Sequence, residues 1–365
     1  MKQKKVIFAL FKMKPLMRIR YGLTVLFLFS LCVLSAEEDP RFTLLPWLQS
    51  FYNPGAMGEK ENHLNFTGVL RQHSFLSYED DPNESSTTLS NNTEKQKGIP
   101  INGEQILLNI ESYIKQIKGA VGVAFLKDKN GYLDNIGFRL GYAAKLRIRG
   151  GKLGIGIQFG FLNMKAADKF NPIEQGDQTL LKTKESVLDF DMNVGLHYKA
   201  PTWHAGVSCT RLLGGGRVRL SGEKNVFNDI PPQLYFTGGY IWNLKTPVPW
   251  SIEPNILIRT NFTAWDIDVM AVARYNGILW FGLSYQHEWA IAALFGAVPF
   301  YNSTNNYLKG LELGLAYSFP ITKTGYRSGG SMGDFEILVR YGFNFYKEKT
   351  LTGYGSSRHL YKNQY

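Results

Sequence analysis

From Gly119 onward, the sequence alternates between apolar residues and polar or small residues with a period of two. In residues 136–148, the even positions carry Ile, Phe, Leu, Tyr, Ala, Leu and Ile, whereas the odd positions carry Gly, Arg, Ala and Lys. Successive side chains of a β-strand point to opposite faces, so the pattern predicts strands with one apolar face. Six further segments repeat this apolar stripe, and none has a charged residue on it. They are residues 153–161, 188–198, 265–275, 279–285, 311–319 and 335–345.

Two architectures accommodate such strands: a soluble sandwich or barrel with an apolar core, and a membrane barrel with an apolar exterior. Strands of about 10–14 residues favour the membrane, because they suit a tilted transmembrane strand. Tryptophans lie at the predicted strand ends, where a barrel places its interfacial girdle. These are Trp203, Trp242, Trp250, Trp265 and Trp289.

The connections between the predicted strands also sort by length. Long stretches (76–102, 165–186, 213–231, 320–333) follow odd-numbered strands, and tight turns follow even-numbered ones. This sorting predicts an all-β transmembrane antiparallel barrel with short periplasmic turns and long extracellular loops. About fourteen strands are expected. They begin near His63, Glu104, Gly119, Asn135, Lys152, Val187, Trp203, Gln233, Ser251, Trp265, Ile278, Ala290, Lys309 and Asp334.

The barrel is therefore expected to span residues 62–346. Since both ends of an even-numbered barrel lie on one side of the membrane, residues 37–61 are expected to form a periplasmic N-terminal segment or plug. Residues 347–365 are expected to form a periplasmic C-terminal tail.

Residues 1–36 are predicted to be a signal peptide. Basic residues precede the apolar run from Leu23 to Leu34, and Ser35-Ala36 offers a small-residue cleavage site. Met1, Met13 and Met17 are alternative starts. Seven of the 41 Lys and Arg residues lie here without any acid, which leaves 34 basic against 30 acidic residues in the remainder. The formal charge of +11 is therefore largely that of a targeting signal, and no nucleic-acid partner is expected.

The sequence predicts neither an enzyme nor a bound cofactor or metal. Ser208 and His204 share a strand, but residues four apart are separated by about 13 Å, too far for proton transfer. No phosphate loop or metal-ligand cluster is recognisable. Asp266 and Asp268, with Arg259 and Arg274 near them, could line an ion path, but a polar lumen neutralised by internal salt bridges is the favoured interpretation.

Several motifs resemble those of PorP/SprF-type type IX secretion proteins of Bacteroidota. Asp39-Pro40-Arg41-Phe42 is similar to that family's DPxFSQY-like opening, and Phe51 to Gly58 is similar to its NPA-Y-AG-like turn. Later blocks follow in the family's order and spacing. They are Leu70-Arg71-Gln72-His73, Gly122-Val123-Ala124-Phe125, Lys152-Leu153-Gly154-Ile155-Gly156, Trp280-Phe281-Gly282-Leu283-Ser284-Tyr285 and Ser357-Arg358-His359-Leu360.

The resemblance implies a non-enzymatic outer-membrane component of the type IX secretion system. Its expected partners are other secretion components, a secreted surface adhesin as cargo, and the lipid bilayer. The two terminal segments are candidates for docking these partners, although the N-terminal one could instead simply plug the lumen. The candidate docking residues are Phe51, Tyr52, Asn53, Pro54, Arg358, His359 and Leu360.

Two alternatives belong to other functional classes. Asn53-Pro54 is also similar to the Asn-Pro turn of FadL-like transport channels, which carry hydrophobic or small solutes. A phospholipase-type enzyme would need a serine and a histidine on adjacent strands, and the sequence places no such pair.

Overall fold

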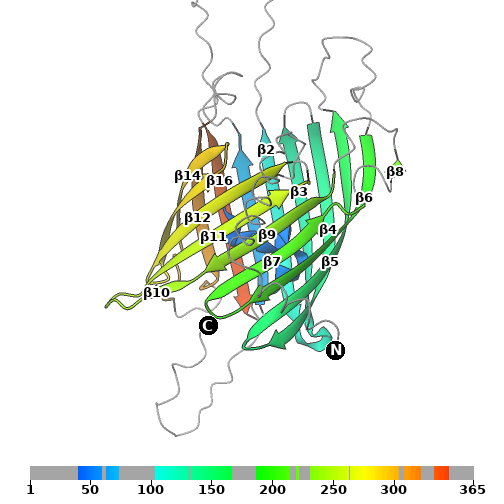
Figure 1. Cartoon of the computed structure of the whole chain (residues 1–365). Helices are drawn as coiled ribbons and strands as arrows, with labels where there is room; N and C mark the ends of the chain where they lie inside the picture. Colours follow the sequence, from blue (N-terminus) through cyan, green and yellow to red (C-terminus); the bar gives the residue numbers. More distant parts are fainter. Residues whose placement is uncertain are drawn as a thin grey trace, which may run out of the picture.

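A computed structural model describes residues 40–59, 63–73, 103–130, 133–166, 186–213, 219–221, 231–262, 264–303, 308–321 and 333–344. Fourteen antiparallel strands close into a barrel (Figure 1), which confirms the predicted fold and strand number. The strands are β1 (His63–Gln72), β2 (Glu104–Ile114), β3 (Gly119–Asn130), β4 (Leu133–Ile148), β5 (Gly151–Ala166), β6 (Ser186–Lys199), β7 (Trp203–Thr210), β9 (Gln233–Tyr240) with β10 (Trp242–Leu244), β11 (Trp250–Thr260), β12 (Trp265–Tyr275), β13 (Leu279–Gln286), β14 (Ala290–Ala297), β15 (Leu311–Pro320) and β16 (Asp334–Asn344).

The wall is a simple succession of neighbours that closes between its first and last strands. β1 pairs with both β2 and β16, and β7 pairs with β9. β9 and β10 both pair with β11 and are interrupted only at Ile241, so they form one strand of the wall. A further short strand, β8 (Arg219–Ser221), pairs with β6 only. None of the helices in the described part of the chain is long and apolar enough to cross a membrane.

The apolar stripe seen in the sequence faces outward. Leu140 on β4 is 53% exposed and Leu283 on β13 is 66% exposed, although both are large aliphatic residues. In water such a surface would be unfavourable, but in a bilayer it contacts acyl chains. The exterior therefore has the composition that a lipid-facing band requires.

A charge placed on this band should destabilise the barrel according to its depth. Leu283 lies in the middle of β13, so we expect Leu283→Arg to lower the free energy of unfolding by about 2–4 kcal/mol. Ile291 is the second residue of β14 and is also exposed, and Ile291→Arg should cost about 0–1 kcal/mol because it lies near the interface. Urea titrations of the refolded protein in lipid vesicles measure both values. Equal losses for the two variants would contradict a membrane midplane at Leu283.

The two ends of the barrel differ in their connections. At the end that we call the short-turn end, Arg149-Gly150 joins β4 to β5, and Asn276-Gly277 begins the three-residue connection between β12 and β13; both pairs have positive φ (49° and 80°, 50° and 66°). Positive φ at both positions is the geometry of a type I′ hairpin turn, which matches the twist of the strands. The Tyr198 hydroxyl donates a hydrogen bond to the carbonyl of Ile148 (3.1 Å) and braces the first of these turns.

Residues 40–59, which precede β1, fold into three short helical turns. These are η1 (Leu45–Trp47), α3 (Gln49–Tyr52) and η2 (Pro54–Ala56). Prolines near the start of η1 and η2 lose no hydrogen bond there, because the first amides of a helix have no partner. The Asn53 side chain accepts a hydrogen bond from the amide of Gly55 (2.8 Å) and so starts η2. We call residues 40–59 the lumen segment, because they lie inside the barrel (Figure 1).

Candidate functional site

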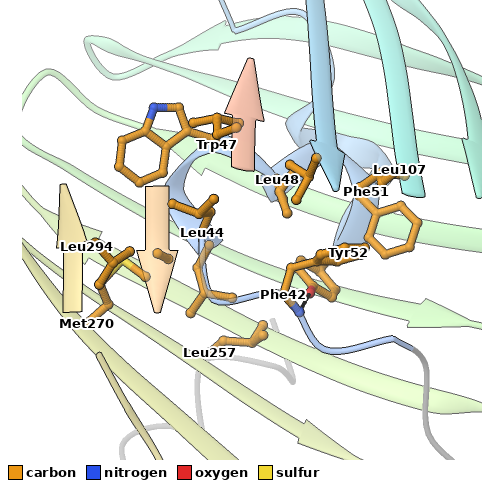
Figure 2. Packing of buried hydrophobic residues seen from close by; sticks show 14 of the residues in the cluster. Phe42, Leu44, Trp47, Leu48, Phe51, Tyr52, Leu107, Leu257, Met270 and Leu294 are labelled. Carbon is orange, nitrogen blue, oxygen red and sulfur yellow. Dashed lines mark hydrogen bonds between the residues drawn. The ribbon is translucent and has the colours of Figure 1, made fainter. Parts of the chain in front are cut away.

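The lumen segment lies inside the barrel, and the strands surround it (Figure 1). Its apolar side chains are buried against lumen-facing residues of the wall, and Figure 2 shows them converging on Leu107, Leu257, Met270 and Leu294. The apolar core of this protein is therefore in its lumen. The segment contributes Phe42, Leu44, Leu45, Trp47, Leu48, Phe51 and Tyr52 to this core.

Aromatic contacts dominate the packing of this core. Trp47 lies against Trp280 of β13 with ring centroids 4.3 Å apart, and Tyr52 lies 5.4 Å from Tyr235 of β9. Phe42 meets Phe51 edge to face at 6.0 Å within the segment. Burying each such side chain stabilises the folded state by roughly 1.5–3 kcal/mol, so apolar burial contributes strongly to holding the segment.

The turn Asn53-Pro54-Gly55 rests on a floor of glycines. This glycine floor consists of Gly154 and Gly156 of β5, Gly195 of β6 and Gly206 of β7. A Cβ on Gly156 would overlap the backbone of Pro54, and one on Gly195 would overlap the Asn53 side chain. Side chains at these positions would therefore keep the turn from the wall. The glycines that alternate with Ile155 and Ile157 are needed for this contact.

Polar bonds fix the same turn in register with the wall. Asn53 donates from Nδ2 to the carbonyl of Leu196 on β6 (2.9 Å). The carbonyl of Tyr52 accepts from the Ser208 hydroxyl on β7 (2.7 Å), and the carbonyl of Gly55 accepts from Lys145 Nζ on β4 (2.8 Å). Three strands thus satisfy polar groups that would otherwise be buried without partners.

A first charged cluster binds the beginning of the lumen segment, near the end of the barrel opposite the short-turn end. Arg71 of β1, which is 0% exposed, contacts Asp334 (2.6 Å) and Glu336 (3.3 Å) of β16. The backbone amide of Thr43 donates to Glu336 (2.8 Å), and the carbonyl of Arg41 accepts from Arg71. The closure between β1 and β16 and the seating of the segment therefore depend on one ionic cluster.

A second cluster neutralises the acidic pair on β12. Arg259 of β11 donates to Asp266 (3.0 Å between Nε and Oδ2) and to Asp268, and Arg41 also pairs with Asp266. Asp268 and Arg259 are 0% and 2% exposed. Internal salt bridges therefore neutralise this pair, as expected, with Arg259 and the lumen segment's Arg41 as the cations, whereas Arg274 pairs with Glu253 and Glu312.

A third network lies beside Trp47. Arg274 of β12 bonds Glu253 of β11 (3.0 Å) and Glu312 of β15 (3.2 Å), and its guanidinium stands 5.3 Å from the ring of Trp47. Arg340 of β16 is 3.5 Å from Glu312. Cations and carboxylates alternate around this part of the wall, so the lumen has no single sign of charge that would select an ion.

The structure separates the candidate docking residues into two groups. Phe51, Tyr52, Asn53 and Pro54 are buried between the lumen segment and the wall, with Phe51 1% exposed. A partner could contact them only after the segment had left the lumen. Arg358, His359 and Leu360 lie outside the described residues, as do the signal peptide and the C-terminal tail.

The groups considered for catalysis serve the lumen segment. The Ser208 hydroxyl is committed to Tyr52, and His204 Nε2 lies 3.1 Å from both Asn255 and Gln49. A cavity of about 10 Å³ beside Gln49 and His204 is large enough for a single water molecule. Within the described ranges, no three His, Cys, Asp or Glu side chains form a group that could hold a metal ion.

The sequence pattern did not predict that part of the lumen wall is apolar. Met270 and Val272 face inward on β12, and Leu257 and Leu294 do so on β11 and β14. Their signal was a loss of alternation: from Val269 to Ala273, both faces of β12 are apolar. A strand that is apolar on both faces must bury its second face against something, and here it buries it against residues 40–59.

Comparison with family models matches residues 34–341 to the family described as Type IX secretion system membrane protein PorP/SprF. No curated protein matches. Among solved structures, the toluene transporter TbuX of Ralstonia pickettii has a TM-score of 0.45 and 12% identity, with 81% of this chain and 93% of that chain covered. A Pseudomonas aeruginosa FadL homologue has a TM-score of 0.41 and 11% identity, with 81% and 94% covered. The family match spans most of the chain and includes nearly the whole barrel, and the protein therefore belongs to the PorP/SprF family of type IX secretion system membrane proteins.

Proposed function

We propose that this protein is a non-enzymatic outer-membrane component of type IX secretion that binds secretion machinery or a secreted surface adhesin. The observation that carries the proposal is the filled lumen: a segment of the chain itself occupies it through apolar, polar and ionic contacts from many strands. With the interior occupied, the loops, the rims and the terminal segments are the surfaces that remain for partners. Residues 1–36 serve in this proposal as the export signal.

The candidate docking residues have different roles in this proposal. Arg358, His359 and Leu360 of the tail dock a partner directly. Phe51, Tyr52, Asn53 and Pro54 contact one only when the lumen segment leaves its seat, since they are buried while it is seated. Binding of a partner would therefore be coupled to release of the lumen segment at these four residues.

Deleting the gene in its host tests the proposed function. We expect at least one protein to disappear from the cell surface or the medium, with a reduction of tenfold or more by quantitative mass spectrometry. Supplying the wild-type gene in trans should restore it. Unchanged secretion together with a lost uptake of hydrophobic solutes would reject the proposal and support the FadL-like channel instead.

A further inference from the structure

A row of cations crosses three neighbouring strands at the short-turn end of the barrel. Arg147 of β4 stands directly opposite Lys152 of β5, and Lys152 stands directly opposite Lys199 of β6. Opposite residues in an antiparallel pair have Cβ atoms only about 4.5–5.5 Å apart, and like charges at that separation repel. We call Arg147, Lys152 and Lys199 the basic row. These three side chains place a concentration of positive charge at this end of the wall, and Glu59 pairs with Lys199.

The basic row points toward the mouth of the lumen and not toward lipid. The residues that alternate with it, Leu146, Leu153 and Tyr198, belong to the outward apolar stripe. The row therefore faces the aqueous side of the wall. A lipid headgroup would be expected on the opposite face of these strands, which makes an aqueous anionic partner the better match.

Two adjoining turns add exposed cations to the same side of the barrel. Lys115 and Lys118 lie in the turn between β2 and β3, and Arg149 lies at the tip of the turn between β4 and β5. Lys118 and Arg149 have φ values of 51° and 49°, a left-handed conformation that Gly and Asn adopt more readily. Another turn at this end uses Asn276 in that conformation.

The hairpin of β4 and β5 carries part of this charge beyond its neighbour. The first residue of β3, Gly119, pairs with Ala144, so residues 145–148 of β4 continue past the end of β3 (Figure 1). The turns on the other side of the same end carry little charge: Asn276-Gly277-Ile278 has none, residues 245–249 contribute Lys245, and the connection between β14 and β15 contributes Lys309. The cations thus gather on one side of the rim and project from it.

The lumen segment itself shows which chemical group the row accepts. Glu59, near the point where the segment leads into β1, places a carboxylate 3.7 Å from Lys199 Nζ. An acidic side chain on an extended segment is therefore already accommodated at one end of the row. Arg147, which is exposed, and Arg149 extend the same positive surface away from Glu59.

We propose that the basic row, with Lys115, Lys118 and Arg149, docks an acidic, extended segment of a periplasmic protein. Short turns of such barrels face the periplasm, so the partner approaches from that side. Like-charged residues held side by side by adjacent strands attract a run of carboxylates and steer its approach. That the partner is a secretion component rests on the proposed function, whereas the binding chemistry rests on the row.

The test uses the full-length protein in a neutral detergent and a fluorescein-labelled deca-glutamate peptide as the probe. We expect saturable binding by fluorescence anisotropy that weakens as salt is raised. R147Q/K152Q should weaken binding at least tenfold. K245Q/K309Q removes the same charge from the other side of the same end and should change binding less than twofold. R149N should weaken binding at least twofold while the melting temperature stays equal or rises, which separates lost charge from lost folding.

Binding that is independent of salt, or weakened equally by K245Q/K309Q, overturns the proposal. It is also overturned if R147Q/K152Q leaves peptide binding intact and instead reduces binding to phosphatidylglycerol nanodiscs, since the row would then be a lipid site. The proposed function can fail independently of this site. If the peptide binds but gene deletion leaves secretion unchanged, the role in secretion is rejected and the basic row remains a binding site. If secretion depends on the gene but the peptide does not bind, only the proposed binding at the basic row is rejected.

Discussion

Adding a methyl group to Gly156 is expected to shift the lumen segment toward a state in which it is released from the barrel wall. The Cβ of Gly156→Ala would overlap the carbonyl carbon of Pro54 and the amide of Gly55, and these backbone atoms cannot turn aside as a side chain can. Gly154 and Gly195 also approach this turn closely, at the carbonyl of Gly55 and at the Asn53 side chain, so little free space surrounds it on the wall. Overpacking of this kind costs about 1–3 kcal/mol, which shifts an equilibrium about 5- to 150-fold toward the released segment.

Release can be measured with a thiol introduced into the segment. Ser50 is 6% exposed, and the described free cysteine, Cys209, is removed by Cys209→Ala. In that background, Ser50→Cys should react with a membrane-impermeant maleimide at least five times faster when Gly156→Ala is present. Ion conductance in planar bilayers should rise in the same variant, because the segment no longer fills the lumen.

Gly137→Ala is the matched control for this change. Gly137 also faces the lumen, on β4, but a Cβ there would meet its nearest neighbour, Leu162, at 3.6 Å, an ordinary van der Waals distance. We expect its labelling rate and conductance to equal those of the parent. If Gly156→Ala behaved like Gly137→Ala, the glycine floor would not be what seats the segment.

Removing Arg259 is expected to destabilise the barrel strongly, because it leaves two acidic side chains in the lumen wall without their main cation. Arg259→Met keeps most of the side-chain volume but leaves Asp266 and Asp268 side by side on β12, where Asp268 is 0% exposed. Breaking a buried ion pair from one side costs about 3–5 kcal/mol, because the remaining charge stays buried without compensation. Arg41 pairs with Asp266 and can offset only part of this loss.

Arg340→Met removes a lumen cation of a different kind. The Arg340 side chain is 26% exposed and its ion pair with Glu312 measures 3.5 Å, while Arg274 also bonds Glu312. A solvent-accessible pair of this sort contributes about 1 kcal/mol or less. Guanidinium unfolding of both variants in the same detergent provides the comparison. A loss for Arg259→Met no larger than that for Arg340→Met would show that water reaches the acidic pair on β12.

The glycine floor and the buried arginines hold the same segment in different ways. The glycine floor permits a close backbone approach, whereas Arg259 and Arg71 neutralise carboxylates that the seated segment covers. If partner docking required release of the segment, Gly156→Ala should also alter secretion without lowering the amount of folded barrel. Heat-modifiable gel mobility of the outer-membrane fraction would verify the amount of barrel.

Much of the wall could be predicted because alternation is a local property. Whether Leu140 faces out and Gly141 faces in depends only on the pleat of one strand. The fourteen strands begin within two residues of the predicted positions, since a tight turn or a polar stretch interrupts the stripe at each end. Asn276-Gly277 favours its turn by its own backbone preferences.

The interior was decided by tertiary structure. Thr43 bonds Glu336 across 293 positions of sequence, and that contact exists only once β1 has paired with β16. Inward residues such as Gly156 and Met270 make their contacts across the lumen, so what they pack against depends on which segment fills the closed barrel. The sequence by itself thus determined the faces and the number of the strands. Closure of the barrel determined what the lumen contains, because only a closed wall brings residues 40–59 into contact with distant strands.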